Sequence, residues 1–154
     1  MFKHIIGACA ALSLAFGIMA PAAADSGVVR VKSAYGMGET IDRLKQDIAA
    51  KGIMFFAEID QAQLAAGADI ELRPSTLLVF GNPPLGTQFI TANADAGLDW
   101  PVRLLVSQDE GGQVWAIYTD FEWIKRSHGI ADRDAQFKMA SDVIASIASA
   151  VAVP

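Results

Sequence analysis

Cysteine and histidine are the scarcest reactive residues in this 154-residue chain, which has one cysteine, Cys9, and two histidines, His4 and His128. Zinc, copper and haem iron prefer imidazole or sulfur ligands, so this scarcity argues against a conventional transition-metal site within one chain. The scattered acidic residues show no loop with EF-hand spacing, which argues against calcium as well. We therefore expect no metal and no cofactor.

Positive charge is also in short supply, with 12 lysines and arginines against 17 aspartates and glutamates. An acidic domain without a basic stripe is a poor candidate for binding nucleic acid or an anionic membrane surface. The sequence has no G-x-S-x-G elbow and no thiol beyond Cys9, so the usual nucleophiles for covalent catalysis are missing.

The first 26 residues, MFKHIIGACAALSLAFGIMAPAAADS, have the pattern of a secretory signal peptide. Lys3 is followed by an uncharged run, which ends in an A-x-A cleavage pattern over residues 22–24. Because Pro21 breaks this run, it is short for a membrane span, although an uncleaved anchor is the alternative. We expect residues 1–24 to be removed and residues 25–154 to form one periplasmic or secreted domain. Cys9 would leave with the signal, so stability would rest on packing and not on disulfides.

Hydrophobic periodicity predicts a mixture of strands and helices after residue 27. Strands are expected at 28–35, 53–60, 75–81, 101–107 and 113–119, and helices at 38–52, 61–67, 84–94 and from about 132 or 134 onward. In the strand at 53–60, alternation places Ile53, Phe55, Ala57 and Ile59 on one side. In the last helical segment, apolar residues repeat at three- and four-residue steps and predict one face turned to the core: Phe137, Ala140, Ile144, Ile147 and Val151. The segment DEGG predicts a hairpin between the last two strands. This order predicts an α+β, two-layer domain with a mainly antiparallel sheet covered by helices.

The segment FGNPPLGT, residues 80–87, looks like a strand that turns into a helix around a bound phosphate. Such a cradle needs free backbone N–H groups in the first helical turn, and Pro83 and Pro84 remove two of them. Asn82 is a good N-cap and Pro83 suits the first helical position. The pattern therefore favours a rigid corner, and it leaves open whether Asn82 and Thr87 face a ligand.

Taken together, these segments resemble the family of the domain of unknown function DUF-302 over roughly Val28 to Val151. The residues that carry the resemblance include Asp60, Ala66, Leu72, Arg73, Pro74, Phe80, Gly81, Asn82, Pro83, Gly86, Thr87, Leu98, Asp99, Pro101, Arg103, Gly112 and Tyr118. The resemblance implies a TBP-like β-α-β4-α fold, here with extra short helices, and a homodimer. It implies no established activity.

The chain departs from the family pattern at two positions. The family usually has Asp-His where this chain has Asp60-Gln61, and commonly has an acid near Ser107-Gln108. Gln61 and Gln108 can form hydrogen bonds but cannot titrate. Either the site is a binding site, or this chain has lost the usual ionisable residues of its family.

The leading hypothesis is an exported, non-catalytic homodimer that binds a small ligand or another protein. The residues expected to line its pocket are Asp60, Asn82, Thr87, Asp99, Arg103 and Tyr118. An alternative is a metal-independent enzyme with Asp60 or Asp99 as base and Arg103 holding an anionic substrate. A purely structural dimer is a third possibility. His128, in the segment KRSHGI, is expected to be an exposed loop or helix-end residue.

Overall fold

The computed structural model describes residues 26–153, so the expected signal peptide and its cleavage site lie outside the described residues. Its centre is one five-stranded sheet with strand order β1-β5-β4-β3-β2, in which every neighbouring pair is antiparallel. The strands are β1 (Val28–Lys32), β2 (Met54–Asp60), β3 (Ser75–Gly81), β4 (Val102–Gln108) and β5 (Val114–Thr119). The predicted α+β class with a mainly antiparallel sheet is confirmed.

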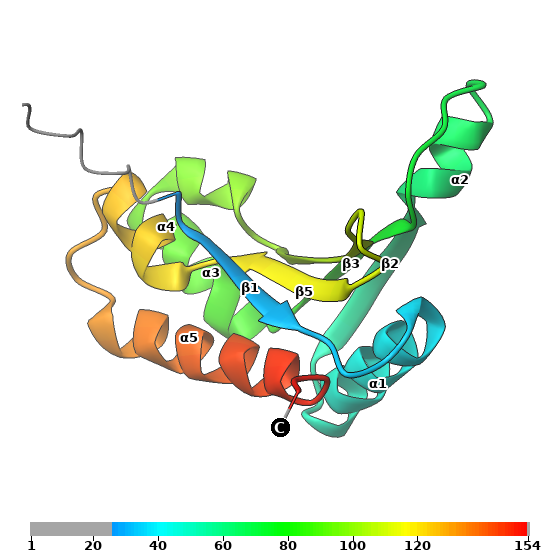
Figure 1. The fold of residues 1–154 in the computed structure, drawn as a ribbon. Helices are drawn as coiled ribbons and strands as arrows, with labels where there is room; N and C mark the ends of the chain where they lie inside the picture. The colour runs from blue at the N-terminus through cyan, green and yellow to red at the C-terminus, as the bar shows by residue number, and fades with distance from the viewer. Residues whose placement is uncertain (1–25, 154) are drawn as a thin grey trace, which may run out of the picture.

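Between residues 26 and 153, six helical segments connect or follow these strands. They are α1 (Met37–Ala50), α2 (Gln61–Ala66), α3 (Pro83–Ala92), the 3-10 segment η1 (Ala94–Leu98), α4 (Phe121–Ser127) and α5 (Asp134–Ser149). Figure 1 shows α1, α3 and α5 against one face of the sheet, while α2 stands out from the far end of β2 and β3. The structure therefore has a helix layer on one side and a projecting segment at one end.

The core forms between the sheet and this helix layer. Leu78 on β3 and Leu104 on β4 are fully buried and belong to one cluster with helix residues. The predicted stripe of α5 is confirmed, because Phe137, Ala140, Ile144, Ile147 and Val151 are all at most 5% exposed. A three- and four-residue repeat places such side chains on one face of a helix, where burial of each Phe, Ile or Val side chain stabilises the fold by about 1.5–3 kcal/mol.

In α1, the buried residues are Thr40, Leu44 and Ile48, whereas Ile41 is only half-buried. Thr40 is fully buried because its hydroxyl has partners: it lies 2.7 Å from the Ser33 Oγ and donates to the Tyr35 carbonyl. A buried hydroxyl without such partners would be costly. Hydrophobic spacing alone does not reveal a polar residue that is satisfied by tertiary contacts.

The prediction that Phe55 and Ala57 share one side of β2 is wrong. The register pairs Phe55 with Phe80 but Ala57 with Val79, with a β-bulge between them. An extra residue, Phe56, lies in this bulge, so the side chains before and after it lie on opposite faces of the sheet. β2 is an edge strand, where a bulge disturbs only one ladder.

Among residues 26–153, no helix combines the length and the apolar character that crossing a bilayer requires.

Candidate functional site

The corner between β3 and α3 uses its polar side chains locally. Asn82 caps α3, its Oδ1 accepting from the Leu85 N–H at 3.3 Å, and Pro83 occupies the first helical position. The Thr87 hydroxyl donates to the Pro83 carbonyl at 2.7 Å. The predicted N-cap is thus confirmed, and the two prolines and the cap leave few free N–H groups for a phosphate.

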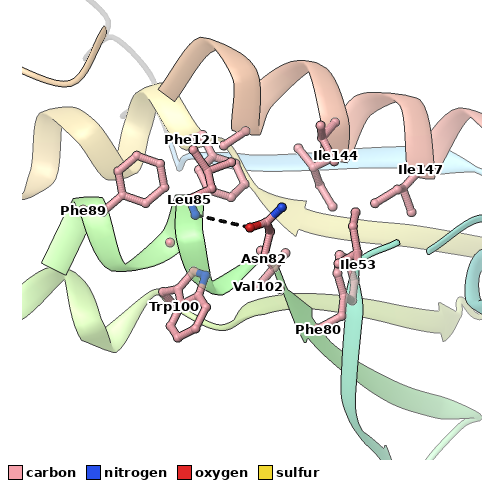
Figure 2. A pocket seen from close by; sticks show the side chains of 14 residues that line it. Ile53, Phe80, Asn82, Leu85, Phe89, Trp100, Val102, Phe121, Ile144 and Ile147 are labelled. Atoms are coloured by element: carbon pink, nitrogen blue, oxygen red, sulfur yellow. Dashed lines mark hydrogen bonds between the residues drawn. The ribbon is translucent and has the colours of Figure 1, made fainter. Parts of the chain in front are cut away.

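A small apolar cavity of about 40 Å³ lies behind this corner, between α3, α5 and the helix-covered face of the sheet. Figure 2 shows its walls, formed mainly by aromatic and branched aliphatic side chains, and the bond between the Asn82 side chain and the Leu85 N–H. The labelled lining residues include Ile53, Phe80, Phe89, Trp100, Phe121, Ile144 and Ile147. Because a site for one water needs about 10–15 Å³ on this measure, the cavity holds only a few non-hydrogen atoms.

Trp100 closes one side of the cavity, and its position depends on two glycines. A Cβ on Gly86 would lie 1.7 Å from the indole Nε1, and one on Gly81 would lie 3.2 Å from it. The indole also meets Phe56 edge-on, with ring centroids 6.2 Å apart. Glycine at these two positions therefore allows the tryptophan ring to rest directly on the backbone of the corner.

Asp99, Arg103 and His128 form a polar cluster at the start of β4. The Asp99 carboxylate contacts Arg103 at 2.9 Å through one oxygen and the His128 Nε2 at 2.7 Å through the other. Arg103 also donates to the Leu98 carbonyl, and Asn93 donates to the His128 carbonyl. The His128 side chain is only 12% exposed. Chemically, the exposed Arg103 could attract an anion, and the contacts of this cluster also connect η1, β4 and the end of α4.

His128 was not among the expected pocket residues, although it is the one histidine after residue 25. It lies at the end of α4, as its C-cap, yet it is not the exposed residue that its segment suggested. Its partner Asp99 is 29 positions away in the sequence. The scarcity of histidine was the signal that could have directed attention to it, but the sequence gives no indication of the pairing.

The other expected pocket residues lie elsewhere. Asp60 caps α2 by accepting from the Gln63 N–H at 2.9 Å, and the adjacent Gln61 accepts from the Ser75 hydroxyl. Tyr118 is partly buried on β5, where burial, together with the nearby Asp120, raises the pKa of its phenol. Arg103 and Tyr118 do border one shallow hollow on the sheet.

The six expected residues therefore occupy several places. Asp99 and Arg103 are in direct contact, and Asn82 and Thr87 share the corner, whereas Asp60 lies at the opposite end of the sheet. Within residues 26–153 there is no group of three or more histidine, cysteine, aspartate or glutamate side chains placed to hold a metal ion.

Within the part of the chain that the structure describes, no helix covers the second face of the sheet, which we call the open sheet face. The register places Ile59, Leu77, Leu105 and Ile117 in one row across β2, β3, β4 and β5, ending at Arg30 on β1. Other members of this face are Ala57, Val79, Trp115, Val28, Lys32 and Arg103. Val28 is 51% exposed and Ile59 is 36% exposed. An apolar row of this kind on a sheet normally packs against another layer.

Over residues 26–153, the fold and these surfaces define a small α+β domain in which helices cover one face of an antiparallel sheet. A crystal structure of an uncharacterized conserved protein DUF302 from Bacillus stearothermophilus has the same fold, with a TM-score of 0.74 and 16% sequence identity. The similarity covers 82% of this chain and 98% of that one. The model of the domain of unknown function DUF302 matches residues 29–152, so the chain belongs to this family.

Sequence comparison also finds longer relatives. Residues of this chain are 35% identical over 106 positions to fluoride-specific ion channel FluC 1 of Brucella suis and to fluoride-specific ion channel FluC 1 of Brucella abortus. The match covers 69% of this chain but only 42% and 39% of those proteins. The chain thus spans less than half the length of the curated relatives that it matches.

Proposed function

We propose that the chain is an exported, non-catalytic interaction domain that acts as a homodimer, with the open sheet face as its contact surface. The observation that carries this proposal is the apolar row formed by Ile59, Leu77, Leu105 and Ile117, which runs across four strands without helix cover. Burial of such side chains against a second copy would be favourable by about 25 cal/mol for each Å² removed from water. Two copies of one surface can bury each other through two-fold symmetry.

The bonding of the candidate bases supports an interaction role over catalysis. Asp60 is engaged as a helix cap, and both Asp99 oxygens are engaged by Arg103 and His128. These carboxylates therefore have structural partners, whereas a general base must lie within hydrogen-bond reach of a substrate proton. The names of the Brucella relatives also fit an interaction role, because there the matching segment forms part of a longer chain named an ion channel.

The homodimer is tested by light scattering across a wide range of protein concentrations. We expect a dimer for the natural chain and a monomer for Ile117→Glu, which places a charge in the centre of the open sheet face. The control is Met139→Glu, because Met139 is 56% exposed on α5, in the helix layer. A natural chain that stays monomeric at high concentration contradicts the proposal.

A second candidate function is small-ligand binding in the cavity behind Trp100. Its apolar walls and single polar edge at Asn82 favour a small apolar ligand with one hydrogen-bonding group. Native mass spectrometry of protein from its own exported fraction tests this idea. A retained small molecule supports it, whereas an empty protein that also shows no shift in a broad thermal screen counts against it.

The alternative of a metal-independent enzyme rests on one contact, the Asp99–His128 pair. A carboxylate that orients an imidazole is a common arrangement for a general base, and Arg103 beside it could hold an anionic substrate. In this form of the alternative, His128 replaces Asp99 as the base. Any turnover found in a substrate screen should then disappear in His128→Gln; turnover that survives this change argues against the cluster as an active site.

A further inference from the structure

We propose that residues 61–74, which we call the arm, reach across the homodimer and lie on the β1 edge of the partner's open sheet face. In this arrangement Asp69 and Glu71 of one copy meet Arg30 and Lys32 of the other. The inference rests on the proposed homodimer and adds which segments of the two copies touch. The arm consists of α2 and the loop that leads into β3.

The arm has almost nothing to pack against within one copy. None of the residues of α2 is buried, and residues 66–74 are all exposed. Three of its apolar side chains point to solvent, with Leu64 66%, Ile70 61% and Leu72 48% exposed. A six-residue helix is far too short to be stable in water by itself. Covering these apolar side chains with a second surface would therefore stabilise the arm.

The register shows where the arm would meet a partner. Ser75, where the arm rejoins the sheet, lies in one row with Ser107, Trp115 and Lys32. The base of the arm and Lys32 are therefore at the same end of the strands but at opposite edges of the sheet. Figure 1 shows this separation, with α2 rising beyond β2 and β3 on the far side from β1.

A two-fold axis between two stacked open faces, parallel to the strands, exchanges the edges of the sheet and keeps its ends. Under this symmetry the arm of each copy lies above the β1 edge of the other, near Lys32 and Arg30. Both arm contacts form at once, because the interface is the same surface on both copies. An axis running across the strands would instead bring the arm to the opposite end of the partner's strands.

The charges of the two segments are complementary. The arm contains Asp69 and Glu71, whereas the open side of β1 contains Arg30 and Lys32. Within the described residues, Asp69, Glu71 and Lys32 form no ion pair, while Arg73 at the base of the arm contacts Glu110 at 3.7 Å. Arg30 lies over the Trp115 ring, 5.1 Å from its centroid. These charges are therefore available to a partner, and complementary charges fix the register of an interface.

The open sheet face alone is smaller than a stable interface, which also favours a contribution from the arm. Strands about 4.8 Å apart that rise about 3.3 Å per residue give this sheet a face of roughly 24 by 20 Å, or about 480 Å². A stable protein–protein interface buries about 800 Å² on each partner. The open sheet face alone falls short of this value, and the exposed arm is the nearest additional surface.

Charge reversal tests the placement of the arm. We expect the double variant Asp69→Lys with Glu71→Lys to raise the dimer Kd at least tenfold, and Arg30→Glu with Lys32→Glu to do the same. Combining all four substitutions restores the opposite-charge pairs and should recover most of the affinity. Asp42→Lys with Asp142→Lys is the control, since it makes the same charge change on α1 and α5. Sedimentation velocity gives the Kd, and circular dichroism checks that each variant is folded.

The outcomes separate the two proposals. If Ile117→Glu breaks the dimer but the charge reversals leave Kd unchanged, the open sheet face is the interface and the arm is not placed as proposed. If the fourfold variant does not recover affinity lost in the double variants, the pairing of the arm with β1 is wrong. A monomeric natural chain overturns both the homodimer and the arm contact.

Discussion

Gly86 shows how tightly one residue can constrain the corner between β3 and α3. A Cβ at this position would lie 1.7 Å from the Trp100 Nε1 and 2.1 Å from its Cε2. The Trp100 ring cannot simply move aside, because Gly81 and Phe56 lie against other parts of it. Glycine is therefore needed at this position because it leaves space for the Trp100 ring.

We expect Gly86→Ala to lower the free energy of unfolding by about 1–3 kcal/mol, because the methyl group overpacks the corner. Gly38→Ala is a matched control within α1, where a Cβ would meet nothing within 4 Å. This change should stabilise the protein by about 0.5–1 kcal/mol through helix propensity. Urea denaturation followed by circular dichroism measures both. A Gly86→Ala variant as stable as the natural chain would show that the indole can move freely.

Residue by residue, the sequence predicted local bonds better than distant ones. Asn82 was expected to cap a helix and does so, because the cap depends on residues within one turn. The contact between Asp99 and His128 depends on how η1 and α4 pack, and no local pattern encodes that. The expected pocket residues were chosen because they match a family pattern. Residues in such a pattern can have separate roles, since Asp60 caps α2 whereas Asp99 pairs with Arg103.

Among the secondary-structure elements, the β4–β5 hairpin is organised by one carboxylate. Asp109 Oδ1 accepts from the Gly111 and Gln113 N–H groups, and Oδ2 accepts from the Trp115 Nε1 at 2.8 Å. The Trp115 bond, followed by the backbone bond from Gln113, lowers the pKa of Asp109 below its ordinary value. Because the folded state holds the charged form, this contribution is present above about pH 4 and is lost as the pH falls through the lowered pKa.

Asp109→Asn should therefore lower the free energy of unfolding at pH 7, and lower it by a smaller amount at pH 3. The amide can still accept from the turn, but its Nδ2 cannot accept from the Trp115 indole. Urea denaturation at both pH values measures the difference from the natural chain. Glu110→Gln is the neighbouring control, since the Glu110 side chain is 87% exposed, and it should have little effect. An equal loss for Asp109→Asn at both pH values would contradict the assigned role.

Periodicity predicted the elements with regular burial and failed where the backbone is irregular. The stripe of α5 was correct because a long helix with one buried face repeats its pattern several times. The face of β2 was wrong because the sequence gives no separate signal for the bulge at Phe56, which shifts the alternation by one residue. A strand of seven residues is too short for the later alternation to reveal the shift.

The whole molecule has an uneven distribution of apolar surface. One sheet face is sealed by helices, while the other presents the row from Ile59 to Ile117. Single exposed apolar residues are ordinary, but contiguous patches usually mark an interaction surface. If a second copy covers this face, folding and association are linked by mass action.

If the whole molecule is a dimer, we expect its melting temperature to rise with protein concentration. A hundredfold increase should stabilise the dimer by about 2.7 kcal/mol. Because two chains unfold together, this energy is shared over both, and it corresponds to a rise of roughly 5 °C. Differential scanning calorimetry measures the effect, and Ile117→Glu should abolish it. A melting temperature that is constant across the range for the natural chain would indicate a monomer.

The position of β1 has a consequence for how the chain is made. Val28 pairs with Thr119, 91 positions later, so β1, the first of the five described strands, can pair only after β5, the last of them, has been synthesised. At a synthesis rate of about 5–20 residues per second, the wait is roughly 5–18 seconds. During that time β1 is unpaired; it contains three valines, with Arg30 between two of them and Lys32 at its end. Charges on an unpaired strand discourage pairing with other chains, so these two residues also protect the newly made chain from aggregation.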